Sequence, residues 1–272
     1  LTIGCRAISG VAEESFVASF IQVDGFVTDE QCHVKIWTDP AGYNRHAGVW
    51  NDNIYRLIIT CRHSILFQGN TAHVHVYGMQ MEVAHAEQPG SDTAIAVTQT
   101  GWHIAENIIR RTNTLDGTGT HFLSVPTGGD IYIWNNLFIG WTYPLSCNHR
   151  WDAVSIIGAV YNNTASQGSI FIRFNAGNGA GFAIVNNISA EYIIANLGVE
   201  SNNVLAENVV FENAVNGIYR LGPSDTVALN QGADLSANGI FAFESDIIGT
   251  ARPQGTAWDI GAFEYVASGG TT

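Results

Sequence analysis

The sequence predicts an all-β fold, a right-handed parallel β-helix in which short strands stack into a single-stranded solenoid. Only 13% of the residues are charged and 46% are hydrophobic. The polar positions hold Asn, Thr, Ser, Gln and Gly rather than the regularly spaced Glu, Lys and Arg of helical surfaces. Val, Ile and aromatic residues occur in short runs, as strands prefer, and a short pattern ending in Asn recurs along the chain.

The chain before about residue 70 shows this pattern least clearly. Residues 34–37 and 55–60 are mostly apolar segments separated by a loop rich in Gly, Asn and Pro, and both are typical of strands. We therefore expect residues 1–70 to form irregular N-terminal strands and first coils.

Residues 71–222 carry the repeat and are expected to form the regular coils. Alternating apolar residues lead to a polar pair that ends in Asn, and a second apolar run follows. The repeated positions are Asn107, Asn136, Asn163, Asn187 and Asn208, and the interval between them shortens along the chain. Three strands of about five residues and three bends fit each interval, whereas a propeller blade needs about 40 residues.

The repeated Asn has a physical role in such a coil. Equivalent residues of stacked coils lie about 4.8 Å apart, so an inward amide can donate to the Asn carbonyl of the next coil. Asn also tolerates the left-handed backbone of tight bends. Scattered surface asparagines are the weaker interpretation, because five of them keep one place in the pattern.

The Asn positions set the register of the coils. The residues three before them should stack inside as an aliphatic column, which comprises Ile104, Ile133, Val160, Ile184 and Leu205. The neighbouring residues then point outward. If Val76 aligns with Ile104, one outward column contains His75, His103 and Tyr132, and the next contains Tyr77, Trp134 and Tyr161.

These six outward residues are the candidate ligand-binding face. Aromatic rings on a flat sheet can stack against sugar rings or bury against a protein neighbour. The alternative is that long loops fold over them and make a second core.

Histidines raise the question of a metal. His73 and His75 lie two apart on an expected strand and so share a face, and His85 and His103 are candidates to lie nearby. No third ligand is fixed by spacing, so the pair is only a weak candidate. We predict no metal and no cofactor.

Catalytic residues cannot be assigned. Inverting glycoside hydrolysis needs two carboxyl groups about 6.5–9.5 Å apart, and the outward columns contain neither Asp nor Glu. Glu106 and Glu207 fall four coils apart in this register. Arg110 and Arg111 are adjacent bases without an aligned acidic cluster.

The charge limits the partners. The formal net charge is −13 and Lys35 is the single lysine, so a nucleic acid or an anionic membrane is an unsuitable partner. No run approaches the ~20 apolar residues of a membrane-spanning helix. Neutral glycans and protein surfaces remain as partners, and a homo-oligomer (a trimer, for example) or an assembly subunit is compatible with these limits.

The C-terminal residues 223–272 break the repeat and are expected to form a cap and tail. They contain the motif Asp259-Ile-Gly-Ala-Phe-Glu-Tyr265, preceded by Ala228-Leu-Asn-Gln-Gly-Ala-Asp234. Both segments resemble the terminal signature of right-handed parallel β-helix repeat proteins with a pectate-lyase-like fold. The resemblance covers roughly residues 70–265, and it implies a fold shared by secreted bacterial proteins, virion proteins including tailspikes, and polysaccharide lyases and hydrolases.

The expected function is that of a non-catalytic extracellular or virion-surface β-helix, such as a spike, fibre or decoration protein. It would present its aromatic face to a glycan or to neighbouring subunits. A secreted polysaccharide lyase or glycoside hydrolase with its active site in the loops is one alternative. A structural subunit of an extracellular assembly is the other.

Overall fold

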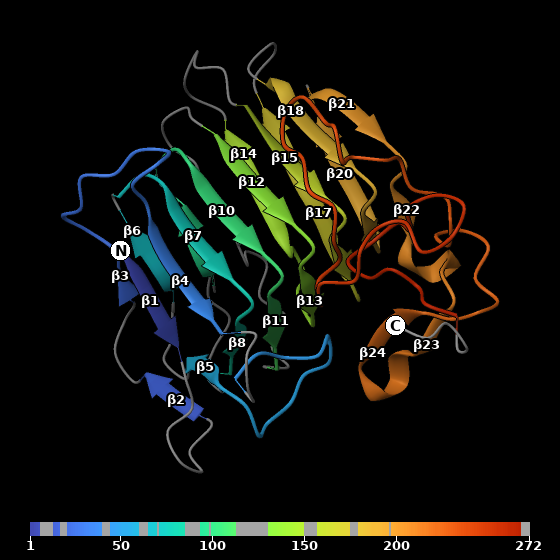
Figure 1. The fold of residues 1–272 in the computed structure, drawn as a ribbon, viewed down its shortest axis with the longest axis horizontal. Coiled ribbons are helices and arrows are strands. Elements are labelled where there is room, and N and C mark those ends of the chain that lie inside the picture. The colour runs from blue at the N-terminus through green and yellow to red at the C-terminus, as the bar shows by residue number, and fades with distance from the viewer. Residues whose placement is uncertain are drawn as a thin grey trace.

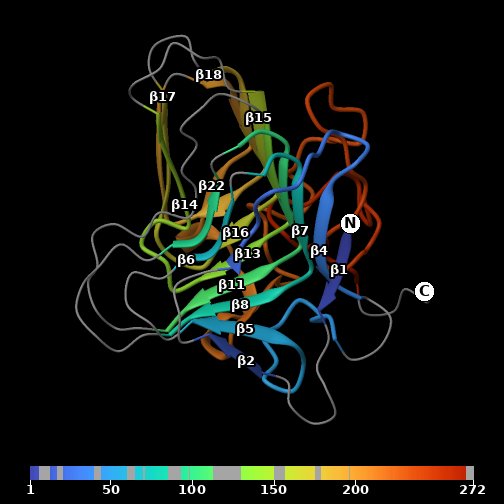
Figure 2. The ribbon, with the colours of Figure 1, turned by 90° about the vertical axis from the view of Figure 1, so that its left-hand side faces the viewer.

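The chain folds into stacked three-sided coils in a computed structural model (Figures 1 and 2). The structure describes residues 1–5, 13–16, 21–39, 44–59, 65–69, 71–84, 93–97, 99–112, 130–149, 157–174, 179–195 and 197–267. The candidate His85 lies outside these residues. None of the described helices is long and apolar enough to cross a membrane.

Two faces of the coils are eight-stranded parallel sheets. Sheet 1 consists of β1 (Thr2–Cys5), β4 (Val34–Thr38), β7 (Val74–Tyr77), β10 (Trp102–Ala105), β12 (Ile131–Trp134), β15 (Ile157–Tyr161), β18 (Gly179–Val185) and β21 (Leu197–Ser201). Sheet 2 consists of β2 (Glu13–Phe16), β5 (Arg56–Ile59), β8 (Gln80–Val83), β11 (Ile108–Arg111), β13 (Leu137–Ile139), β16 (Thr164–Ala165), β19 (Ile188–Ser189) and β22 (Val204–Leu205).

The third face is made of two three-stranded sheets. One contains β3 (Ile21–Gln22), β6 (Ile65–Gly69) and β9 (Thr93–Val97), and the other contains β14 (Leu145–His149), β17 (Ser169–Phe174) and β20 (Glu191–Ala195). After β22 come two 3-10 helices and a hairpin, namely η1 (Ala206–Asn208), β23 (Phe211–Asn213), η2 (Ala214–Asn216) and β24 (Ile218–Leu221).

The expected parallel β-helix is therefore confirmed. Strands next to one another in a sheet come from successive coils, and Figure 2 looks along the stack, so that the three faces are seen edge-on. The strands before residue 70 join the same two long sheets, with Val34 opposite Val74. The coils thus extend through the boundary expected at residue 70.

The interior is an aliphatic column in the predicted register. Val76 lies opposite Ile104, Ile104 opposite Ile133, and Val160 opposite Ile184. All five of these side chains, with Ile133 opposite Val160, are fully buried. Each buried aliphatic side chain contributes roughly 1.5–3 kcal/mol, so the column is a main source of stability.

The asparagine ladder is confirmed for four of the five predicted positions. Asn107 Nδ2 donates to Asn136 Oδ1 at 3.0 Å, and Asn136 Nδ2 donates to Asn163 Oδ1 at 3.0 Å. Asn163 Nδ2 continues to Asn187 Oδ1 at 3.1 Å. The backbone N–H of each of these asparagines donates to the same side-chain Oδ1 of the next ladder Asn. Two hydrogen bonds therefore join each bend to the bend of the next coil.

The fifth position was wrong. Asn187 Nδ2 donates to Asn203 Oδ1 at 3.0 Å, whereas Asn208 is exposed in η1. Glu200, not Leu205, therefore lies opposite Ile184. The last coil is the shortest of the ladder, and the pair Asn202–Asn203 was the better match to the Asn–Asn pairs of the preceding coils.

The left-handed residue of each bend is the one before the ladder Asn. It is Glu106 at φ 59° in the first of these coils and Asn135, Asn162, Asn186 and Asn202 in the next four, at φ 51–61°. Asn adopts this region at low cost because its short side chain hydrogen-bonds locally. In each Asn–Asn pair, the first residue adopts the left-handed backbone of the bend and the second forms the ladder hydrogen bonds.

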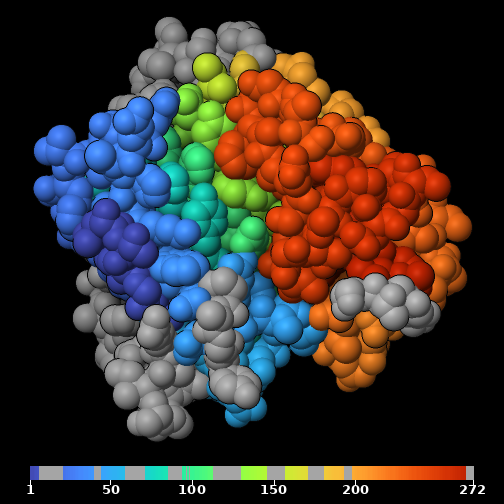
Figure 3. Space-filling model, viewed as in Figure 1, coloured from blue at the N-terminus to red at the C-terminus, as the bar shows by residue number. Residues whose placement is uncertain are grey.

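The C-terminal residues 223–267, here called the strap, leave the coils and lie across the outer face of sheet 1 (Figures 1 and 3). The outward amides of the bends hold it. Asn135 Nδ2 donates to the carbonyl of Ser245, Asn162 Nδ2 to that of Asp259, and Asn186 Nδ2 to that of Ala233. The hairpin preceding the strap packs Leu221 near Ile188 and closes the last coils.

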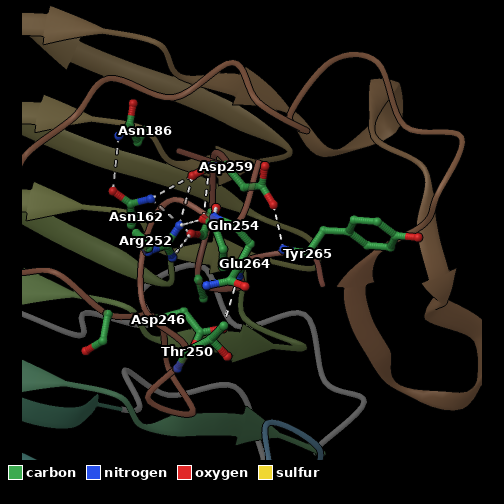
Figure 4. A network of polar contacts seen from close by, with 12 residues as sticks. Asn162, Asn186, Asp246, Thr250, Arg252, Gln254, Asp259, Glu264 and Tyr265 are labelled. Carbon is green, nitrogen blue, oxygen red and sulfur yellow. Dashed lines mark hydrogen bonds and ion pairs between the residues drawn. The ribbon is translucent and has the colours of Figure 1, made fainter. Parts of the chain in front are cut away.

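A buried polar network fixes the strap itself (Figure 4). Arg252 donates to Glu264 at 2.9 Å, and both side chains are almost completely buried. Asp259 accepts from the N–H of Asn230 and of Tyr265, and Asp246 accepts from that of Glu264. Asp246 and Asp259 thus satisfy backbone donors of a segment without regular strands.

Candidate functional site

The outer surface of sheet 1 carries two columns in the predicted register. His75 lies opposite His103 and His103 opposite Tyr132, while Trp134 lies opposite Tyr161. Because Lys35 lies opposite His75 and Trp37 opposite Tyr77, the same columns begin one coil earlier than the prediction placed them.

The strap covers the later part of this face. Phe241 stacks on Tyr132 with ring centroids 4.8 Å apart and lies 4.3 Å from Trp134. Trp134 is 7% exposed and Tyr161 is completely buried in a cluster with Leu235 and Trp258. Of the six predicted ligand-binding residues, these two therefore belong to a second core, the alternative that the sequence left open.

The other four predicted residues, His75, Tyr77, His103 and Tyr132, are half-buried. Together with His33, Lys35 and Trp37 they lie at the edge of the region covered by the strap, where Phe241 still contacts His103 with ring centroids 5.4 Å apart. We call His33, Lys35, Trp37, His75, Tyr77 and His103 the open section. In Figure 3 the teal and green atoms of this region lie between the blue N-terminal residues and the red strap.

Three imidazoles form a stack in the open section. The rings of His33 and His75 are 3.9 Å apart and those of His75 and His103 are 4.1 Å apart, with interplanar angles of 18° and 6°. Burial, with a smaller contribution from the neighbouring histidines, lowers the pKa of His75 to about 3 and that of His103 to about 4. These two rings are neutral at physiological pH and stack without mutual repulsion.

The aromatic rings beside the stack are polar at their edges. Tyr77 Oη lies 3.2 Å from His103 Nδ1, within hydrogen-bond distance. Lys35 Nζ lies 4.4 Å from the ring centre of Trp37 and 5.3 Å from that of Tyr77. The ammonium of Lys35, which belongs to the same sheet, thus lies over both ring faces in a cation–π arrangement.

The weak metal candidate does not take the expected geometry. β7 starts at Val74, and His73 is the left-handed bend residue at φ 50°, so it is not a strand neighbour of His75. His75 instead has its ring faces against His33 and His103. Within the described residues no group of three or more His, Cys, Asp or Glu could hold a metal ion.

Of the charged residues weighed for catalysis, Glu106 and Arg110 are engaged in ion pairs. Glu106 forms an ion pair with Arg45, and Arg110 donates to Glu82 at 2.7 Å. Glu207 is exposed in η1. The two outward columns of sheet 1 contain no carboxylate along the described strands.

Sequence reasoning missed Lys35, Trp37 and His33, although one signal was present. The alternation in Val34-Lys-Ile-Trp-Thr38 places Lys35 and Trp37 on one side, and without an Asn marker the segment could not be aligned with later coils. Phe241 carried no signal, since it lies far along the chain from Trp134 and outside the repeat.

Comparison with known proteins gives no relative. No protein-family model, no curated protein and no solved structure matches the chain.

Proposed function

We propose that the protein is a β-helix of an extracellular or virion surface that binds a neutral glycan on the open section. The single observation behind the proposal is the pair of half-buried rings, Trp37 and Tyr77, that lie opposite each other on adjacent strands of a parallel sheet. Their spacing of one strand, about 4.8 Å, lets one sugar ring contact both.

The polar groups of the open section support a hydroxyl-rich ligand. Neutral imidazoles have one donor and one acceptor nitrogen each, and Tyr77 adds a hydroxyl group. His33 Nδ1 is buried and has no hydrogen-bond partner among the described residues.

The electrostatics support a neutral rather than an acidic glycan. Lys35 is the only lysine or arginine of the open section. Burial raises the pKa of Tyr132, and the nearby carboxylates of Asp130 and Glu30 raise it further. With a net charge of −13 the protein repels strongly acidic polymers at long range.

The test is glycan-array binding with Trp37→Ala. We expect at least a tenfold loss of affinity, about 1.4 kcal/mol, because one of the two ring faces is removed. Trp50→Ala, which truncates an indole on another face, is the matched control and should bind like the wild type. Equal binding by Trp37→Ala and the wild type, with both folded by circular dichroism, would remove the open section from consideration.

Contact with a neighbouring subunit is the competing function of the same protein. Exposed apolar side chains at the first coils favour it, since Leu1 is 65%, Phe26 44% and Val27 100% exposed. It predicts a trimer or larger assembly in mass photometry that Val27→Asp lowers to a monomer, with no glycan on the array. An enzyme, the remaining alternative, would release reducing or unsaturated sugar ends from a polysaccharide panel.

A further inference from the structure

A cavity away from the open section lies between residues 45–54 and Arg220 of the hairpin formed by β23 and β24. Figure 1 shows these two segments at the lower edge of the molecule. The volume of the cavity is about 360 Å³, enough for a small ring with one substituent. The cavity is lined by Arg45, Ala47, Val49, Trp50, Asn51, Ile54 and Arg220.

Arg220 reaches into this cavity from β24. Nη2 donates to the carbonyl of Ala47 at 2.7 Å, which is the one hydrogen bond of its guanidinium within the described part of the chain. Nε is buried and has no partner there. A guanidinium has five N–H donors in a fixed fork and no acceptor, so most of its donors remain available to a bound group.

Three other arginines differ from Arg220 in one respect. Arg45 pairs with Glu106, Arg110 with Glu82 and Arg252 with Glu264. Among the described residues no carboxylate forms such a pair with Arg220, although it is half-buried like Arg45. Leaving a partly buried charge without a counter-ion is unfavourable, and a bound anion would remove that cost.

Trp50 forms the wall facing this donor. Its indole Nε1 donates to Asp52 at 2.8 Å, and the guanidinium of Arg110 lies 3.7 Å from its ring centre. Val49 and Ile54 extend the apolar wall beside it. An occupant can therefore place a flat or apolar part on this wall while its charged group meets Arg220.

Arg220 lines two cavities, and the charges in each lining determine which of them favours an anion. The cavity on its other side, about 310 Å³, contains Glu212, Asp246 and Glu264 and repels anions. The lining of the cavity on the Trp50 side contains no carboxylate among the described residues.

We propose that this cavity is a binding site for a carboxylate carried on a flat ring, with Arg220 as the bidentate donor and Trp50 as the stacking wall. A planar carboxylate matches two parallel N–H groups of a guanidinium, which gives it preference over a hydroxyl or a spherical anion. The site is separate from the open section and does not depend on glycan binding there.

Benzoate, benzyl alcohol and inorganic phosphate test the proposal when titrated into the ¹⁵N-labelled protein. The readout is the indole N–H signal of Trp50, assigned by comparison with Trp50→Phe. We expect benzoate to shift this signal saturably, at least ten times more tightly than either other probe. Benzyl alcohol lacks the charge and phosphate lacks the ring. Equal affinity for benzoate and benzyl alcohol, or for benzoate and phosphate, would overturn the proposal.

Variants of Arg220 show whether its side chain binds the carboxylate or only holds the carbonyl of Ala47. Arg220→Gln should weaken benzoate binding at least tenfold, and Arg220→Lys should weaken it less, because the charge remains while the fork is lost. Glu212→Gln, which alters the other cavity, should leave it unchanged. If Arg220→Gln keeps the wild-type affinity for benzoate, Arg220 is only a brace to Ala47 and the proposal fails.

Discussion

At the scale of the residue, one amide satisfies several buried groups at once. Asn136 Nδ2 lies within hydrogen-bond distance of the carbonyls of Ile104 and Trp134 as well as of Asn163 Oδ1, and its own Oδ1 accepts from Asn107. A shorter or apolar side chain leaves carbonyls and an N–H unpaired in a site without water access. The ladder is therefore sensitive to every member.

Asn136→Ala tests this sensitivity. We expect it to lower the free energy of unfolding by about 3 kcal/mol, because several buried groups lose their partner together. Asn208→Ala is the matched control, since Asn208 is exposed outside the ladder, and it should change stability by less than about 0.5 kcal/mol. Urea denaturation measures both, and similar losses in the two variants would contradict the assignment of Asn203 as the last ladder position.

At the scale of the element, the strap has no sheet of its own and depends on charges buried within it. Arg252 and Glu264 are 0% and 1% exposed at their side chains. Breaking such a pair by removing one charge costs about 3 to 5 kcal/mol, whereas exposed pairs contribute less than about 1 kcal/mol. The strap should therefore detach as a unit when the pair is broken.

Glu264→Gln and Asp52→Asn make the same chemical change in a buried pair and in a pair whose carboxylate is exposed. Asp52 is 64% exposed beside Arg56. We expect Glu264→Gln to lower stability by at least about 3 kcal/mol and to speed hydrogen exchange in residues 223–267, while Asp52→Asn does neither. Equal effects would mean that the backbone bonds to the outward asparagines hold the strap without the ion pair.

At the scale of the whole molecule, buried neutral histidines couple stability to pH. His46 accepts from the N–H of Gly48 at Nδ1 and lies 2.7 Å from the carbonyl of Glu106 at Nε2. Burial lowers the pKa of His46 to about 4. The unfolded chain binds protons at these histidines near pH 6.5 and the folded chain does not, so their contribution is present above pH 6.5 and is lost as the pH falls toward 4.

We therefore expect the free energy of unfolding to decrease between pH 6.5 and pH 4.5, with His46 accounting for about 2 kcal/mol. Asp259 acts in the opposite direction, because burial raises its pKa to about 6 and its contribution grows as the pH falls below that value. Three lowered histidines outweigh one raised carboxyl. Urea unfolding of the wild type and of His46→Gln measures the effect, and a profile equally steep in both would refute the role of His46.

The sequence by itself determined the coils, because they follow from local rules. The alternation of apolar residues places Ile104 and Ile133 inside and His103 and Tyr132 outside, and the Asn–Asn pair marks each bend. These signals repeat at one-coil intervals, so the alignment of each coil is supported by the coils before and after it. The error at Asn208 arose where the last coil shortened and the repeat no longer constrained the alignment.

The tertiary structure alone decided which part of the aromatic face stays open. Burial of Trp134 and Tyr161 depends on Phe241 and Leu235, which reach them from a distant and non-repeating segment. No period in the sequence specifies where such a segment returns, because its path is set by single contacts such as those of the bend asparagines with strap carbonyls. For the same reason the cavity between Trp50 and Arg220, which are far apart in the sequence, appears only in the folded chain.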